Sequence, residues 1–246
     1  MRGRIHIGTS GWHYEHWRGP FYPEGIAAKD MLAFYAEHFS TVEVNNSFYR
    51  LPGAKAVEAW RDETPSNFIF ACKASRYTTH VKRLKDAPQS FEKFFPRVDP
   101  LGKKLGPILF QTPPRFPPDP ERLAAFVAAL PQKHSYAFEF RDERWFIDEV
   151  REVLTKGNCA FCIFDFGGMQ SPMWTTADFA YLRLHGPGAK YQNSYGDKAL
   201  RDWADQIHAF AATALDVYCY FDNDQSGYAP QNALHLLQIV GRKAAA

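Results

Sequence analysis

Short runs in which apolar side chains recur at every second position appear eight times along the chain and predict β-strands. These runs are Arg4–Gly8, Thr41–Asn46, Phe68–Lys73, Pro107–Gln111, Tyr136–Arg141, Ala160–Asp165, Ala180–His185 and Val217–Asp222. Between most of them the apolar residues recur at helical spacing instead. The clearest helix is expected over Asp119–Leu130, where Asp119 is the N-cap and Pro120 opens the first turn. Another is expected over Gly196–Ala212.

Strands that alternate with helices predict βαβ units and a parallel sheet. Eight such strands in 246 residues predict a single TIM-type (β/α)8 barrel domain over residues 1–246. An open doubly wound sheet is the main alternative, but no Gly-x-Gly-x-x-Gly follows the first strand. Residues 166–178 are too short and broken for a full helix, so the helix between strands six and seven is expected to be missing or vestigial.

The two faces of the predicted strands carry different residue types. One face is apolar and is expected to contact the helices; on strand six we assign Cys162 and Phe164 to it. The opposite face, expected to line the barrel lumen, carries Gly8, Ser10, Glu43, Asn45, Ser47, Lys73, Gln111, Glu139, Arg141, Asp165, Arg183, His185 and Asp222. Because barrel enzymes place their sites at the carboxyl ends of the strands, these polar side chains are expected to converge in one cleft there.

The residue types in this predicted cleft suggest proton transfer on a bound anion. The candidate catalytic residues are Glu139, Asp165, Glu43 and His185, which are the groups able to exchange a proton. The candidate substrate-binding residues are Lys73, Arg76, Arg141, Arg183, Asn45, Gln111, Trp12, Tyr49, Asp222 and Asn223. A salt-bridge network in the lumen, for instance Glu43 or Glu139 with Arg141 or Arg183, is the structural alternative.

No cofactor is predicted for this chain. A divalent metal could be held by the carboxylates and His185, but Lys73, Arg141 and Arg183 would oppose it in the same cavity. No metal ligand is therefore assigned.

Composition and charge narrow the partners. Charged residues make up 23% of the chain and the net charge is only +2, which argues against nucleic acid or an anionic membrane as the main partner. No stretch approaches the roughly 20 apolar residues of a membrane span. All four cysteines lie in apolar runs, and Cys159 and Cys162 are expected on opposite faces of one strand, so no disulfide is predicted. A cytoplasmic location is expected.

Several motifs resemble the family catalogued as domain of unknown function 72. They are GTSGW at 8–12, TVEVNNSFYRLP at 41–52, FIFACK at 68–73 with Arg76, FEFRDERW at 138–145, YLRLHG at 181–186, YCYFDND at 218–224 and GYAPQNA at 227–233. The resemblance implies a TIM-barrel fold and the same site, and it implies no particular reaction. This chain has Asp222-Asn223 where the family usually has two asparagines.

The favoured interpretation is an enzyme performing acid/base chemistry on a small polar anionic metabolite, such as a sugar phosphate or nucleotide fragment. One alternative is a non-catalytic protein that binds or senses such a metabolite. Another is a nucleic-acid-processing barrel that uses the basic segment 73–85. Ligand turnover separates the first two, and a steep dependence of binding on salt would favour the third.

Overall fold

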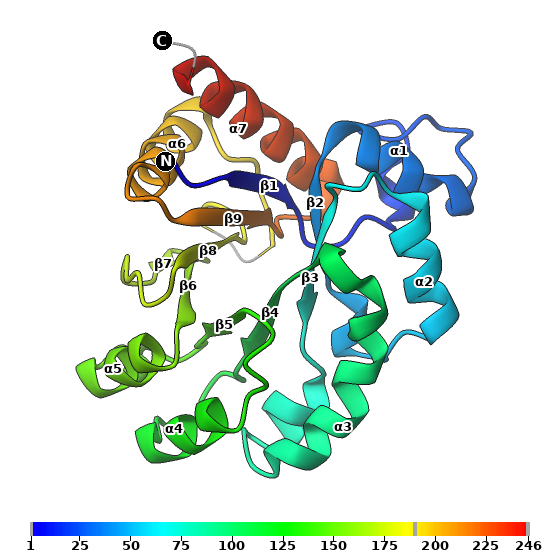
Figure 1. The fold of residues 1–246 in the computed structure, drawn as a ribbon. Helices are drawn as coiled ribbons and strands as arrows, with labels where there is room; N and C mark the ends of the chain where they lie inside the picture. Colours follow the sequence, from blue (N-terminus) through cyan, green and yellow to red (C-terminus); the bar gives the residue numbers. More distant parts are fainter. Residues whose placement is uncertain (1, 189–190, 245–246) are drawn as a thin grey trace. The chain divides into compact units, whose positions relative to one another are not determined.

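Helices and strands alternate along the chain in this computed structural model, which describes residues 2–188 and 191–244 (Figure 1). The strands are β1 Ile5–Thr9, β2 Thr41–Val44, β3 Ile69–Lys73, β4 Leu105–Gln111, β5 Tyr136–Glu139, β6 Cys159–Phe166, β7 Met169–Gln170, β8 Phe179–Leu184 and β9 Asp216–Phe221. The α-helices are α1 Met31–His38, α2 Ala54–Glu63, α3 Ala87–Val98, α4 Pro120–Ala128, α5 Asp148–Lys156, α6 Asp197–Ala212 and α7 Tyr228–Ala244. The described residues group into two compact units.

The first unit comprises Met1–Val42, Phe164–Gln170 and Phe179–Ala246. Its strands β1, β9 and β8 lie side by side and are parallel. Cys219 of β9 is opposite Ile7 of β1 on one side and Leu182 of β8 on the other. The C-terminal end of β6 lies next to β8 in the sheet, since the amide of His185 donates to the carbonyl of Asp165 at 2.9 Å. Helices α6 and α7 pack on each other and on β9.

The second unit comprises Glu43–Ile163 and Ser171–Asp178. Its strands run in the order β2, β3, β4, β5 and the N-terminal part of β6, and the pairs from β3 onward are parallel, with a shift of register between Phe70 and Cys72 of β3. Helix α2 packs on α3, and α4 packs on α5 (Figure 1). Each unit thus repeats the strand-to-helix connection that parallel pairing requires.

The fold is the mixed α/β architecture of a TIM-type barrel, as the alternating pattern predicts. No helix forms over the described residues between β6 and β8, which confirms the missing helix. A two-residue strand, β7, instead turns back antiparallel on β6 through Gly167 and Gly168. Their φ angles of 60° and 86° are the positive values that a tight hairpin turn requires. The expectation of one domain stays a prediction.

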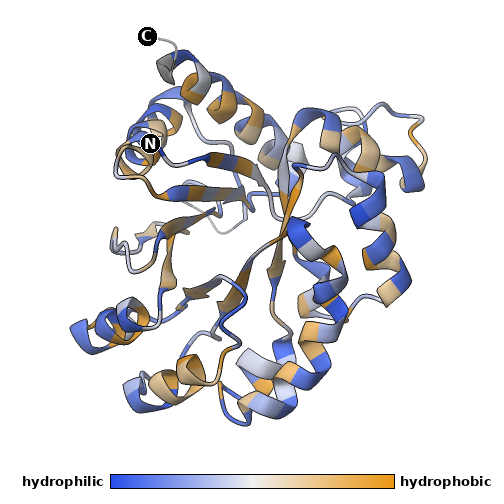
Figure 2. Ribbon diagram, in the orientation of Figure 1, coloured by the Kyte–Doolittle hydropathy of each residue, from blue (hydrophilic) through white to orange (hydrophobic). Residues whose placement is uncertain are grey.

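Aromatic side chains fill the layer between strands and helices of the second unit. Phe110 and Phe138 on neighbouring strands stack at 5.3 Å, and Phe126 of α4 meets Phe110 edge-on at 5.1 Å. Figure 2 shows the strands coloured mainly as hydrophobic and the helices as mixed. The Asp119 side chain accepts from the amide of Arg122 at 2.9 Å, so the predicted N-cap of α4 is confirmed. No described helix has the length and apolarity needed to cross a membrane.

The predicted facing of strand six is wrong. Phe161 is in register with Phe138 and contacts the ring of Phe140, so it lies on the face that meets the helices. Cys162 lies on the other face, where its thiol contacts the Glu139 carboxylate. Cys159 is in register with Tyr136 on the helix face, so the two cysteines do point to opposite faces. None of the four cysteines is in a disulfide.

A buried lysine closes the C-terminal end of α2. The ammonium of Lys104 donates to the carbonyl of Arg61, and to the carbonyl and hydroxyl oxygens of Thr64 at 2.6 and 3.1 Å. Carbonyl groups at the end of a helix lack partners within the helix and carry partial negative charge. Lys104 therefore joins the segment before β4 to the end of α2.

Replacing Lys104 by Met should lower the free energy of unfolding by about 2–3 kcal/mol, because charged hydrogen bonds to three acceptors are lost. Urea denaturation measures this change. The matched control is Lys103→Met at the exposed neighbouring position, where a change within roughly 0.5 kcal/mol is expected. Equal losses in the two variants would contradict the capping role.

Candidate functional site

Four neighbouring strands of the second unit end in polar side chains. Asn45 follows β2, Lys73 ends β3, Gln111 ends β4 and Glu139 ends β5. Gln111 is directly opposite Glu139 in the β4–β5 register, and Lys73 is opposite Leu109, two residues before Gln111. Because parallel strands place their carboxyl ends at one edge, this part of the prediction is consistent with the second unit taken by itself.

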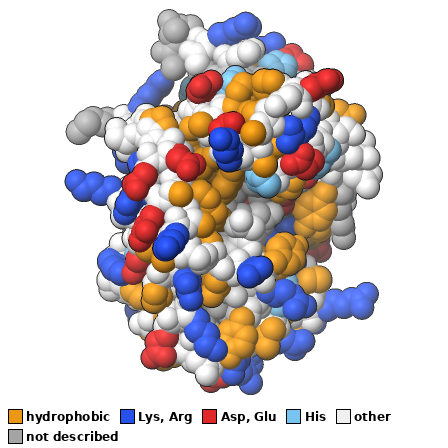
Figure 3. Space-filling view, turned by 90° about the vertical axis from the view of Figure 1, so that its right-hand side faces the viewer, with side chains coloured by type: hydrophobic (Ala, Val, Ile, Leu, Met, Phe, Trp, Pro, Cys, Tyr) orange, Lys and Arg blue, Asp and Glu red, His pale blue; other side chains and the backbone are white. Residues whose placement is uncertain are grey.

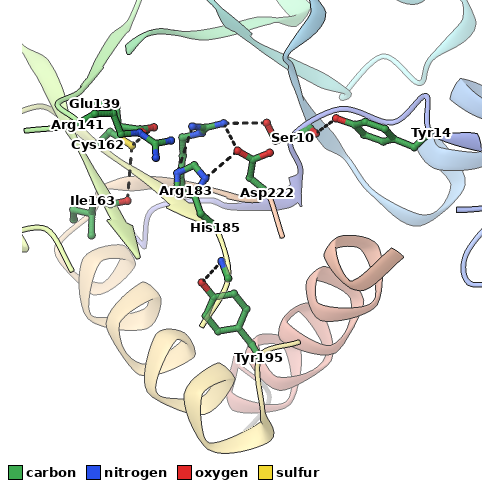
Figure 4. A network of polar contacts seen from close by, with 11 residues as sticks. Ser10, Tyr14, Glu139, Arg141, Cys162, Ile163, Arg183, His185, Tyr195 and Asp222 are labelled. Atoms are coloured by element: carbon green, nitrogen blue, oxygen red, sulfur yellow. Dashed lines mark hydrogen bonds and ion pairs between the residues drawn. The ribbon is translucent and has the colours of Figure 1, made fainter. Parts of the chain in front are cut away.

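A buried ion pair lies at the end of β5. Glu139 is 0% exposed, and its Oε1 pairs with the Nε of Arg141 two residues later (Figure 4). The thiol of Cys162 contacts Oε2 at 3.9 Å. Glu43 is also fully buried, and its charge adds to burial in raising the pKa of the Cys72 thiol. One ion pair of the proposed structural network is thus present in this unit.

Phe48 organises the cations at the end of β3. The ammonium of Lys73 lies 4.5 Å from the centre of the Phe48 ring, and the His80 ring meets the same ring edge-on at 5.0 Å. The hydroxyl of Ser47 donates to the carbonyl of Lys73 at 2.6 Å, which fixes the backbone between the two strands. Lys73 and His80 therefore both contact one aromatic ring.

Positive charge is concentrated around His80. Burial first, and then the charges of Arg76, Lys73 and Arg141, lower the pKa of His80 to about 4 from its ordinary 6.5. Lys and Arg side chains are abundant in the lower part of Figure 3, which is at the height of α3 in Figure 1. His80 lies within the basic segment 73–85 but is not among the predicted site residues, and a turn of π-helix over Tyr77–Val81 directs it onto Phe48.

The first unit holds a second buried polar cluster at the ends of β8 and β9. Arg183 is 0% exposed and donates from Nη2 to Asp222 Oδ2 at 3.0 Å and to Ser10 Oγ at 3.1 Å (Figure 4). The same Asp222 oxygen lies 2.9 Å from His185 Nδ1. One carboxylate thus serves both basic side chains. Asp222 supplies the negative charge of this cluster.

The contacts of His185 constrain its tautomer. Nε2 lies 3.4 Å from Nη1 of Arg183, and a guanidinium can only donate a hydrogen bond. A tautomer in which Nε2 accepts and Nδ1 donates to Asp222 is compatible with both contacts. The rings of Phe166 and Tyr191 enclose the imidazole at 5.2 and 5.5 Å. This tight packing gives His185 a positioning role within the first unit.

Asp165 does not face His185, the other predicted catalytic residue of its unit. Phe164 and Phe166 contact the His185 ring, so Asp165 between them faces the opposite side of β6. Its Oδ2 accepts from the Tyr195 hydroxyl at 3.1 Å, and that hydroxyl accepts from the Gly186 amide. Burial raises the pKa of Asp165. The assignment of Asp165 to the lumen is corrected accordingly.

Three other predicted binding residues have defined surroundings. The amide nitrogen of Asn223 donates to Asn193 O and Asn232 Oδ1, both at 2.8 Å, and so joins the loop before α6 to α7. Trp12 is buried, and its carbonyl accepts from the Tyr22 hydroxyl. Tyr49 is 79% exposed beside Phe48. Among these, only Tyr49 presents its ring to solvent.

The predicted residues fall into two groups, each within one unit. Ser10, Arg183, His185 and Asp222 are joined by contacts in the first unit. In the second unit, the charges of Lys73, Arg76 and Arg141 all act on His80, and Arg141 also pairs with Glu139. A single cleft that contains both groups stays a prediction. No set of three His, Cys, Asp or Glu side chains within the described ranges is arranged to hold a metal.

Comparisons with known proteins agree with the resemblance seen in the motifs. A family model described as "Protein of unknown function DUF72" matches residues 6–246. UPF0759 protein YunF of Bacillus subtilis (strain 168) is 26% identical over 269 residues, covering 96% of this chain and 94% of YunF. UPF0759 protein YecE of Escherichia coli (strain K12) is 30% identical over 155 residues, covering 62% of this chain and 54% of YecE.

A solved structure is similar over nearly the whole chain. The DUF72 family protein TM1631 of Thermotoga maritima MSB8 matches with a TM-score of 0.88 and 28% identity, covering 97% of this chain and 99% of that one. None of these descriptions names a substrate or a reaction.

Replacing Arg183 by Ala should lower the free energy of unfolding by about 3–5 kcal/mol, because Asp222 loses a buried ion-pair partner. Thermal and urea denaturation measure this loss. Arg201→Ala is the control, since Arg201 pairs with Asp197 on an exposed helix surface, where about 1 kcal/mol or less is expected. If Arg183→Ala were no more destabilising than the control, the buried network would not support the fold.

Acid should destabilise the protein in part through His80. Its pKa is about 4 in the folded state and near 6.5 when unfolded, so the unfolded chain binds more protons between these values. Stability is therefore lost as the pH falls through this window. His80→Gln should lose less stability than the wild type between about pH 7 and about pH 4.5 in urea denaturation. Identical pH profiles would show that His80 does not carry this effect.

Proposed function

The chain belongs to the DUF72 family of proteins of unknown function, and we propose that it binds a small anionic metabolite at the ends of β3 and β5. On this ligand it performs acid/base chemistry. The observation that carries the proposal is the concentration of cations around His80, where burial and then the charges of Arg76, Lys73 and Arg141 lower its pKa to about 4. Like charges brought together at the carboxyl ends of barrel strands are typical of a site for an anion.

The binding role rests on how the cations are placed. Lys73 and Arg141 are largely buried, so their interaction with an anion would be screened less by water than at an exposed surface. Lys73 provides a compact charge and Arg141 a planar fork, a pair suited to a phosphate or carboxylate group. Arg76 is exposed and would attract the anion from solution.

Proton transfer is assigned to Glu139, with Glu43 as the second carboxylate of the same unit. Glu139 ends β5, and its partner Arg141 is also one of the proposed anion-binding groups. A carboxylate next to the bound anion can take a proton from it, and Arg141 can stabilise the negative charge that forms. Asp165 and His185 are left out of this step because they lie in the first unit, where Tyr195 donates to Asp165 and His185 contacts Asp222.

One observation favours a second function, binding without turnover. Glu139 is fully buried and already paired with Arg141, as expected for a carboxylate that supports the fold. A metabolite sensor would use the same cations and leave the ligand unchanged. Turnover distinguishes the two functions: ¹H and ³¹P NMR of a phosphorylated ligand incubated with the protein shows whether its bonds change.

Lys73→Met should weaken the binding of inorganic phosphate about tenfold or more, since a buried charged contact is removed. Isothermal titration calorimetry at low ionic strength measures the dissociation constant. Lys29→Met, at an exposed position of the first unit, is the control and should bind as the wild type does. Phosphate should also raise the pKa of His80 in an NMR titration, because the anion offsets its neighbouring charges. Unchanged binding by Lys73→Met would contradict the proposed site.

A further inference from the structure

Two amide side chains beside the proposed anion site carry oxygens that lack hydrogen bonds. Gln111 is 9% exposed, and its Oε1 is shielded from solvent with no hydrogen-bond partner among the described residues. Asn45 Oδ1 is likewise shielded from solvent and has no hydrogen-bond partner among the described residues. Nearly all buried polar atoms in folded proteins are paired, so each orphaned oxygen calls for an explanation. A ligand that donates hydrogen bonds to them would provide it.

Both amides flank Lys73 along the sheet of the second unit. Gln111 ends β4, next to β3, and is opposite Glu139 on β5. Asn45 directly follows β2, which lies on the other side of β3, and Ser47 two residues later donates to the carbonyl of Lys73. A ligand whose anionic group pairs with Lys73 thus meets an amide on either side.

We propose that the ligand is a hydroxylated anion, a polyol carrying a phosphate or carboxylate group, whose hydroxyls bond to Gln111 and Asn45. This inference rests on the proposed function, because it takes the anionic group to lie with Lys73 and Arg141. A hydroxyl both donates and accepts, so it satisfies a side-chain amide in either orientation of its oxygen and nitrogen. An aliphatic acid or alkyl phosphate would leave both amide oxygens unpaired.

A ligand that lacks the hydroxyl groups should bind more weakly at such a site. Leaving a buried polar group without a hydrogen-bond partner costs more free energy than leaving an exposed one unpaired. Sites built around hydrogen bonds therefore reject analogues that lack the bonding group. The orphaned oxygens also reduce stability in the ligand-free protein. Replacing Gln111 by Leu, similar in size and apolar, should therefore leave the melting temperature unchanged or raise it.

The test compares matched ligands by isothermal titration calorimetry. Glycerol 3-phosphate and n-propyl phosphate share an anionic group and chain length but differ by two hydroxyls, and glycerate and propionate form the corresponding carboxylate pair. The hydroxylated member of the preferred pair should bind the wild type at least about tenfold more tightly. Which pair binds shows whether the anionic group is a phosphate or a carboxylate.

Substitutions at single positions test which residues produce the preference for the hydroxylated ligand. Gln111→Leu should abolish the preference for the hydroxylated ligand and leave the binding of its partner unchanged, and Asn45→Ala should reduce the preference in the same way. Lys73→Met should weaken both members of the pair alike. Gln132→Leu, at an exposed position of the same unit, is the control for the substitution itself.

The outcomes separate the two proposals. Equal binding of the hydroxylated and plain ligands to the wild type overturns the inference and leaves the anion site standing. No binding of any of the four ligands overturns both. A Gln111→Leu variant that loses stability, or that weakens both ligands equally, shows that Gln111 supports the structure, and this too overturns the inference.

Discussion

The burial of ionisable side chains on the inner face of parallel strands is the constraint on which both polar clusters depend. Arg183 in the first unit and Glu139 in the second are completely buried. A charge without compensation at such a position costs several kcal/mol, so each requires a partner held in place by the sheet. Residues two apart on one strand share a face, which places Arg141 beside Glu139. Arg183 on β8 instead pairs with Asp222, which follows the neighbouring strand β9.

The two clusters meet this constraint differently. In the first unit, Asp222 bridges Arg183 and His185, and Tyr195 and Asn223 tie the surrounding loops to it. These contacts hold the side chains in place within the first unit, and their predicted catalytic and binding roles stay predictions. In the second unit, three cations act on His80, and two amide oxygens lack partners within the described residues. Three cations close to one histidine, together with two amide oxygens that lack partners among the described residues, are typical of a site built for a ligand.

Much of the fold could be predicted from local pattern. The strand positions follow from alternation, and the N-cap at Asp119 follows from its place before Pro120. Strand six could not be oriented in this way, because Cys-Ala-Phe-Cys-Ile-Phe-Asp-Phe is apolar at every position but one. Asp165 was taken as the marker of the inner face, whereas its actual partner, Tyr195, lies 30 residues away. His80 was missed for a related reason: a turn of π-helix, which has no periodic signal, directs it onto Phe48.

The central claim is that an anion binds between Lys73 and Arg141. The most direct measurement is a crystal structure of the protein soaked in selenate, with anomalous scattering used to locate the selenium. We expect an anomalous peak within hydrogen-bond distance of the Lys73 ammonium, and loss of that peak in Lys73→Met. Selenate bound only at exposed lysines, with no peak at Lys73, would contradict it.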